Sequence, residues 1–158
     1  MSLSTFDYIN KVLEVSADVL EIKYTKESLR SLELFCSDYG GPFIANFLME
    51  ETGRTKINST LDNVTYTINL LIIVTRDYDL TPEQIKKAES DARVIANNYI
   101  NLIKTSKKGT VDDFRFSGRY REGGYGGAGV NGFITFSIPD QDSKCEYFCN
   151  DMIKNIEC

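Results

Sequence analysis

The segment from Val64 to Lys104 constrains the fold more than any other part of the chain, because an alternating strand pattern runs directly into a helix pattern. Every even position from Val64 to Val74 is apolar, whereas the odd positions are polar at first and apolar from Leu71 onward. Side chains alternate between the two faces of a strand, so one face should lie in the core throughout and the other should be covered only near its C-terminal end. At about 3.3 Å per residue this strand would be about 36 Å long, roughly twice the usual length. Such a length favours a contact outside the strand's own domain.

The helix pattern that follows begins with strong start signals. Thr81 and Gln84 have the spacing of a capping box, in which each side chain accepts a hydrogen bond from the other residue's main-chain amide. Pro82 takes the first helical position, where its missing N–H group costs nothing. The residues beyond form an apolar stripe with spacings of three and four, made of Ile85, Ala88, Ala92, Ile95, Ala96, Tyr99, Leu102 and Ile103. We expect an amphipathic helix that packs on a sheet and ends before Gly109.

Weaker patterns predict the remaining elements. Ser4 and Asp7 mark the start of an N-terminal helix that should end near Glu21. A second, shorter helix is expected over Lys26–Ser37. Further strands are expected at residues 43–50, 114–121 and 133–138, with a short strand at 54–57 and turn-rich segments at 51–54 and 58–63.

This order of elements predicts an α+β fold. An antiparallel or mixed sheet of about four strands should pack against the N-terminal helix and the central amphipathic helix, and a glycine-rich hairpin loop should join the last two strands. We expect residues 1–138 to form a single domain. Residues 139–158 would be a C-terminal extension with a short helix, because apolar residues reappear there after a polar start.

Length and charge exclude several classes of protein. A chain of 158 residues is one domain by expectation. Its formal net charge of −5 argues against a protein whose main task is to bind nucleic acid, because such proteins carry a basic excess. No window approaches eighteen apolar residues, and the first residues lack the basic and apolar regions of a signal peptide. We expect a soluble, unexported protein without a membrane segment.

The cysteines do not form a metal or disulfide motif. Cys145 and Cys149 are four residues apart, Cys158 is the last residue, and Cys36 lies far from all three. The chain contains no histidine that could complete a mixed zinc site. In an unexported protein, free thiols are therefore favoured, and no cofactor is expected.

The segment Gly123–Gly132 holds six glycines and is predicted to be a loop. It contains the spacing G-x-G-x-x-G at Gly127, Gly129 and Gly132, which in dinucleotide-binding proteins follows a strand and opens a helix. Here the next residues continue as a strand, so a nucleotide site is rejected. The alternatives left open are a flexible hairpin arm that becomes ordered against a neighbouring subunit, and a loop with no partner.

Few residues are suited to catalysis. Without histidine, the commonest general base and the Ser-His and Cys-His nucleophile pairs are excluded. The pairs Asp77/Asp79 and Asp112/Asp113 could hold a divalent ion or act in acid–base catalysis. Both pairs lie in predicted turns, where aspartate is common for its local hydrogen bonds, so the turn interpretation is favoured.

Arg115, Arg119 and Arg121 occupy alternate positions of a predicted strand and should share one face with Ser117. Their alternation with aromatic residues is also typical of strands that stack bases and bind phosphate. A solvated face or a contact face explains the pattern equally well. On an acidic protein we favour a contact to another subunit.

The order of elements resembles that of the tail-terminator and tail-completion proteins of tailed bacteriophages. The resemblance covers about residues 3–138 as a pattern of elements: an N-terminal helix, a strand after Gly40-Gly41-Pro42, the long strand, the helix that starts at Thr81, and a final hairpin ending at Ile138. In particular, Tyr66–Tyr78, an alternating strand that ends in Thr-Arg-Asp before a helix, is similar to the central segment of that family. The cysteine-containing extension departs from the pattern.

The resemblance implies a structural virion protein without enzymatic activity, made in the host cytoplasm and located in the tail or neck. It would form a homo-oligomeric ring, hexameric or alternatively twelve-fold, between the tail tube and the connector or adaptor proteins, and DNA would pass through without specific binding. The long strand and the arginine face would contact adjacent protomers, and the glycine-rich arm and the loop 51–63 would reach the next ring. The contact residues expected on this basis are Arg54, Lys56, Arg115, Arg119, Arg121, Gly124, Tyr125 and Gly127.

Two alternatives remain. One is a head-completion or adaptor ring protein of the same neck, which differs in stoichiometry and partner. The other is a small carboxylate-based enzyme or ligand-binding domain, which would require Asp77, Asp79, Asp112 or Asp113 to converge in a pocket.

Overall fold

The computed structural model describes residues 4–26, 41–58, 61–77, 79–121 and 127–140. Within these ranges the elements follow one another as α1 (Thr5–Val19), β1 (Lys23–Thr25), β2 (Phe43–Lys56), β3 (Asp62–Thr75), α3 (Pro82–Ile103), β4 (Thr110–Arg121) and β5 (Gly127–Pro139). The strands form one sheet in the order β1-β2-β3-β5-β4. β1 pairs with β2 in parallel, and all other pairs are antiparallel. The predicted α+β class with a mixed sheet is confirmed, with five strands in place of about four.

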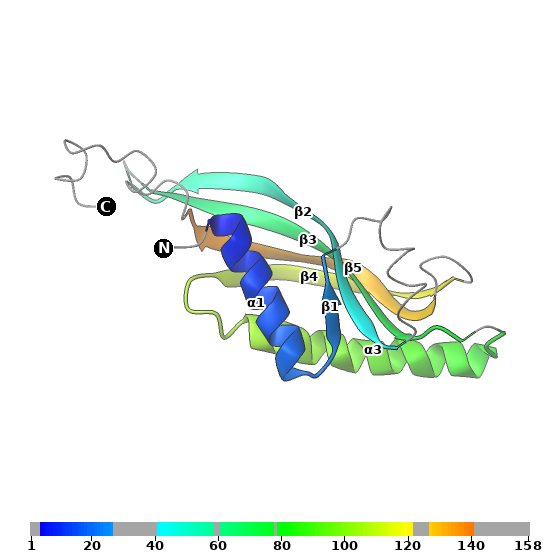
Figure 1. Cartoon of the computed structure of the whole chain (residues 1–158). Coiled ribbons are helices and arrows are strands. Elements are labelled where there is room, and N and C mark those ends of the chain that lie inside the picture. The colour runs from blue at the N-terminus through cyan, green and yellow to red at the C-terminus, as the bar shows by residue number, and fades with distance from the viewer. Residues whose placement is uncertain (1–3, 27–40, 59–60, 78, 122–126, 141–158) are drawn as a thin grey trace.

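Both helices pack on the same face of the sheet (Figure 1). The main core contains the buried even-numbered residues of β3, including Val64, Ile68 and Ile72, together with Ile9 and Leu13 of α1. The buried Tyr99 of α3 ties the two helices together, because its hydroxyl donates a hydrogen bond of 2.9 Å to the carbonyl oxygen of Leu13. Burial holds the pKa of Tyr99 well above its usual value.

On the opposite face of the sheet, buried apolar residues gather at one end. Phe43, Ala45, Leu71 and Ile73 form a second apolar cluster there, and each is completely inaccessible to solvent. The odd positions closer to the start of β3, such as Thr65, are half-buried. The prediction that this face of the long strand becomes covered toward its C-terminal end is therefore confirmed.

The helix starts agree with the sequence prediction. The side chain of Ser4 accepts a hydrogen bond from the amide of Asp7, and α1 ends at Val19. At α3, Gln84 N donates to Thr81 Oγ1 at 3.2 Å and Thr81 N donates to Gln84 Oε1 at 2.8 Å, which completes the capping box. None of the described helices is long and apolar enough to cross a membrane.

Three strand predictions need correction, and one strand was missed. The turn expected at residues 51–54 is absent, because β2 continues to Lys56 through a bulge between Glu51 and Gly53, and the expected loop 51–63 is largely strand. β1 was not predicted. Residues 127–132 of the predicted glycine-rich loop belong to β5. β3 lies third in the sheet and pairs along nearly its whole length with β2 and β5, so it does not reach beyond its own domain.

Two predicted elements lie outside the described residues. These are the second helix over Lys26–Ser37, of which only Lys26 is described, and the helix of the extension 139–158, of which only Pro139 and Asp140 are described.

Candidate functional site at the sheet edges

β4 forms one edge of the sheet and pairs with β5 alone among the described strands. Its register places Arg115, Ser117, Arg119 and Arg121 opposite alternate residues of β5, so these four side chains share the face away from the helices, as predicted. Arg115 and Arg121 are exposed, whereas Arg119 is half-buried. Arg119 and Arg121 already interact with other groups of the chain. Arg115 is therefore the arginine best placed for an external contact.

The outer side of β4 is partly occupied by side chains of α3. Arg93 forms an ion pair of 2.9 Å with Glu89, and its Nη1 donates a hydrogen bond of 3.3 Å to the carbonyl oxygen of Phe116. Successive carbonyls of a strand point to opposite sides, and that of Arg115 faces β5, so the Phe116 carbonyl faces outward. Glu89 lies so close over Gly118 that a Cβ at this position would overlap with its carboxylate.

A second side chain caps the same edge. The carboxylate of Asp113 accepts a hydrogen bond of 2.8 Å from the main-chain amide of Phe114. Charged side chains on an edge strand are a common device against unwanted strand pairing. Arg93 and Asp113 therefore occupy main-chain groups on the β4 edge, and we call this arrangement the edge guard. Pairing with another chain would require Arg93 to release the Phe116 carbonyl.

Along the opposite edge of the sheet, β2 extends beyond the end of β1. β1 pairs only with Phe43–Ala45, and no described strand pairs with residues 46–56 of β2 on the side away from β3. Glu50 and Lys56 are exposed in this part of β2. The sheet thus has two long edges, one at β4 and one at the second half of β2.

Arg54, one of the predicted contact residues, is engaged within the chain. Its Nη1 lies 2.6 Å from the carboxylate of Asp140 and 3.0 Å from that of Asp62, and its Nη2 lies 2.8 Å from Glu51. Hydrogen bonds to Asp140 and Asp62 raise the pKa of Arg54. Asp140 is only 4% exposed and also accepts a 2.9 Å hydrogen bond from Thr5 Oγ1. Arg54 therefore joins the ends of β2, β3 and β5, and Asp140 extends this cluster to the start of α1.

The three glycines of the G-x-G-x-x-G pattern all lie in β5, and none opens a helix. Gly127 has a φ of 139°, which favours glycine. A Cβ at Gly129 would overlap with the carbonyl of Ile72, and one at Gly132 with the carbonyl of Arg115. Close approach of the neighbouring strands explains the last two glycines. Gly124 and Tyr125, the other contact residues predicted in this region, lie outside the described residues.

The turn predicted for both pairs of aspartates needs correction for one of them, because Asp112 and Asp113 lie within β4. Asp77 and the hydroxyl of Thr75 are bonded to each other, and Asp79 has a φ of 56°. Asp112 accepts hydrogen bonds from Thr110 and from Ser137. Among the described residues, no group of three or more Cys, Asp or Glu side chains is arranged to hold a metal ion.

A polar cluster between α1, β1 and β2 was not predicted. The hydroxyl of Tyr24 donates to Asn10 Oδ1 at 3.2 Å, and Asn46 Nδ2 lies 3.3 Å from the same oxygen and from the hydroxyl of Tyr24. Burial is the main cause that raises the pKa of Tyr24 to about 12. Asn10 interrupts the apolar side of the first helix next to Ile9, and this was the sequence signal that could have indicated the cluster.

Comparison of the chain with models of known protein families and with curated proteins gives no match. Support for a function therefore comes from the two sheet edges, the exposed Arg115 and the cluster around Asn46.

Proposed function

We propose that this chain is a structural protein of a tailed bacteriophage that forms a ring at the junction of tail and neck. As a tail terminator or tail-completion protein, it joins the tail tube to the head connector and lets DNA pass. The observation that carries the proposal is the pair of long edges on opposite sides of a single sheet, β4 and residues 46–56 of β2, with which no further described strand pairs. The order of elements described from the sequence supports the same assignment.

The directions of the strands suit a head-to-tail ring. From β2 through β3 and β5 to β4, every neighbour runs antiparallel to the last, so β4 runs opposite to β2. In a ring whose subunits are related by rotation, β4 of one copy next to β2 of the following copy would continue this alternation. A contact between two different surfaces generates a closed ring when the rotation closes.

The charges along the two edges favour the same contact. Arg115 is exposed on β4, and Glu50 is exposed on the open half of β2. Opposite charges across an interface direct the encounter and fix its orientation. Arg93, held by Glu89, occupies the Phe116 carbonyl in the free subunit. A main-chain amide of the neighbouring β2 must replace Arg93 there, so the contact favours a strand that can donate this hydrogen bond.

A concentration series tests the proposal. The mass of the purified protein in solution, together with negative-stain images, should show closed rings, alone or after addition of a preformed tail tube. Arg115→Glu and Glu50→Arg should each weaken the ring, and the double variant should recover part of it. Lys86→Glu, an exposed change on α3, is the matched control. A monomer under every condition would contradict the proposal, and six-fold or twelve-fold symmetry would separate a terminator from an adaptor.

A further inference from the structure

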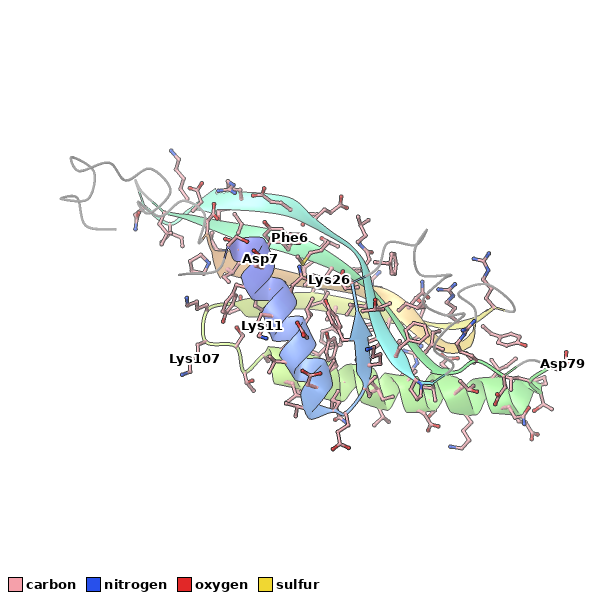
Figure 2. All side chains as sticks on the ribbon, in the orientation of Figure 1. Phe6, Asp7, Lys11, Lys26, Asp79 and Lys107 are labelled. Carbon is pink, nitrogen blue, oxygen red and sulfur yellow. The ribbon has the colours of Figure 1, made fainter. Side chains whose placement is uncertain are left out.

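A groove runs along the side of β2 where β1 has ended. It has a volume of about 340 Å³ and is lined by Phe6 and Asn10 of α1, by Lys26, and by residues 46–49 of β2. Figure 2 shows Phe6 and Lys26 near the upper half of α1. Phe6 is 45% exposed and Leu48 is 49% exposed. Lys26 is the one charged side chain among these lining residues, so the groove is apolar with a cation at its rim.

Asn46, one of the residues that line this groove, carries a buried hydrogen-bond acceptor. Asn46 is only 5% exposed, and its Nδ2 group bonds Asn10 and Tyr24. Within the described part of the chain, no group donates to its Oδ1 atom. A buried polar atom without a partner destabilises the folded state, and folded proteins rarely leave one. The groove is therefore suited to an occupant that brings an N–H donor as well as apolar side chains.

The C-terminal extension leaves the domain close to this groove. Asp140 is held by the hydroxyl of Thr5, and Phe6, the next residue of α1, lines the groove. The 18 residues 141–158 could span about 59 Å when fully extended, at about 3.3 Å per residue. They carry the apolar residues Tyr147, Phe148, Met152, Ile153 and Ile156 and the acidic residues Asp142, Glu146, Asp151 and Glu157.

We propose that the C-terminal extension of the chain docks in this groove of its own domain. Its apolar side chains cover Phe6 and Leu48, one of its amide N–H groups donates to Asn46 Oδ1, and a carboxylate lies at Lys26. The combination matches the lining of the groove in polarity, hydrogen bonding and charge. A monomer can make this contact. The groove takes in residues 46–49 of β2, so in the proposed ring residues 50–56 would remain for β4 of the next copy.

Limited trypsin digestion of the full chain tests the docking. Lys154 is the last basic residue, and cleavage after it releases residues 155–158, which intact-mass measurement detects. Leu48→Glu and Lys26→Glu should each speed this cleavage about tenfold, because proteolysis follows the population of the undocked state. Val94→Glu, which changes an exposed apolar residue of α3, should cleave at the wild-type rate.

Three results would overturn the proposal. The first is an equal cleavage rate at Lys154 in the wild type and both groove variants. The second is protection that rises with protein concentration, which would assign the extension in the groove to a second copy. The third is equal acceleration by Val94→Glu. Cleavage after Lys86 or Lys87, in the middle of α3, reports unfolding of the whole domain. If Leu48→Glu is found to be unfolded by this control, Lys26→Glu alone provides the test.

Discussion

The guanidinium group of Arg93 on α3 donates a hydrogen bond of 3.3 Å to the main-chain carbonyl oxygen of Phe116 on β4. A helix side chain thus reaches an acceptor that faces away from the sheet, where another strand would otherwise bind. Glu89 holds Arg93 in place at 2.9 Å and covers Gly118. The same helix that packs the core therefore also guards the edge of the sheet.

Removal of this guard should promote self-association. We expect Arg93→Ala to lower the protein concentration at which oligomers form, because the Phe116 carbonyl becomes available to another strand. The loss of stability should stay below about 1 kcal/mol, since the ion pair is exposed. Sedimentation at several concentrations measures the association. Lys87→Ala, which removes the other i,i+4 ion pair of α3, is the control and should not change it. If Arg93→Ala associates at the same concentration as the wild type, Arg93 does not protect the β4 edge.

Gly132 should tolerate no side chain. A methyl group there would overlap with the carbonyl of Arg115, so Gly132→Ala should lower the free energy of unfolding by at least about 2 kcal/mol. Gly53→Ala is the matched control, because its added Cβ would lie 3.6 Å from Thr65 Cβ, an ordinary contact distance. Its effect should stay within about 1 kcal/mol. Urea unfolding of both variants gives the comparison, and equal losses would count against the close approach of β4 and β5.

Asp140 should matter more than the other partners of Arg54. Asp140→Ala removes the buried carboxylate that accepts hydrogen bonds from Thr5 and Arg54, and we expect a loss of about 2 kcal/mol. Glu51→Ala removes an exposed partner of the same arginine and should cost less than about 0.5 kcal/mol. Thermal unfolding distinguishes the two. Similar losses of stability for both variants would show that the buried Asp140 contributes no more to stability than the exposed Glu51.

Stability should fall in alkaline solution. The pKa of Tyr24 is about 12 in the folded chain, whereas a tyrosine exposed to water in the unfolded chain has a pKa of 10.0. The folded state therefore holds this proton more tightly than the unfolded state. Stabilisation from Tyr24 is therefore complete below about pH 10 and is lost as the pH rises toward 12, which amounts to about 3 kcal/mol. Urea unfolding across this range should show a shallower decline for Tyr24→Phe. An identical decline in both proteins would exclude Tyr24 as a cause.

Local signals in the sequence were sufficient for the helices. Ser4 and the pair Thr81 and Gln84 cap their own helices, and such contacts depend on residues three apart. The alternation from Val64 onward also identified β3, including the covered odd positions Leu71 and Ile73.

Non-local pairing explains what the sequence did not reveal. The turn-prone residues 51–54 remain in β2 because β3 pairs with them, and Gly127–Gly132 form a strand because β3 and β4 hold them from both sides. β1 has three residues, too few for an alternating pattern. In the candidate site, the shared face of Arg115 and its neighbours followed from alternation alone. The contacts of Arg54 with Asp140 and of Asn46 with Asn10 join distant residues, and no local pattern encodes them.

The hydrogen bond between Thr5 and Asp140 brings the beginning of α1 and the residue that follows β5 to one corner of the molecule. A circular permutant could therefore join these two points with a short linker and open the chain between Lys107 and Lys108, which are exposed in the connection from α3 to β4. All five strands and both helices would remain whole in such a protein. Fusion partners attached before Thr5 or after Asp140 would likewise emerge side by side.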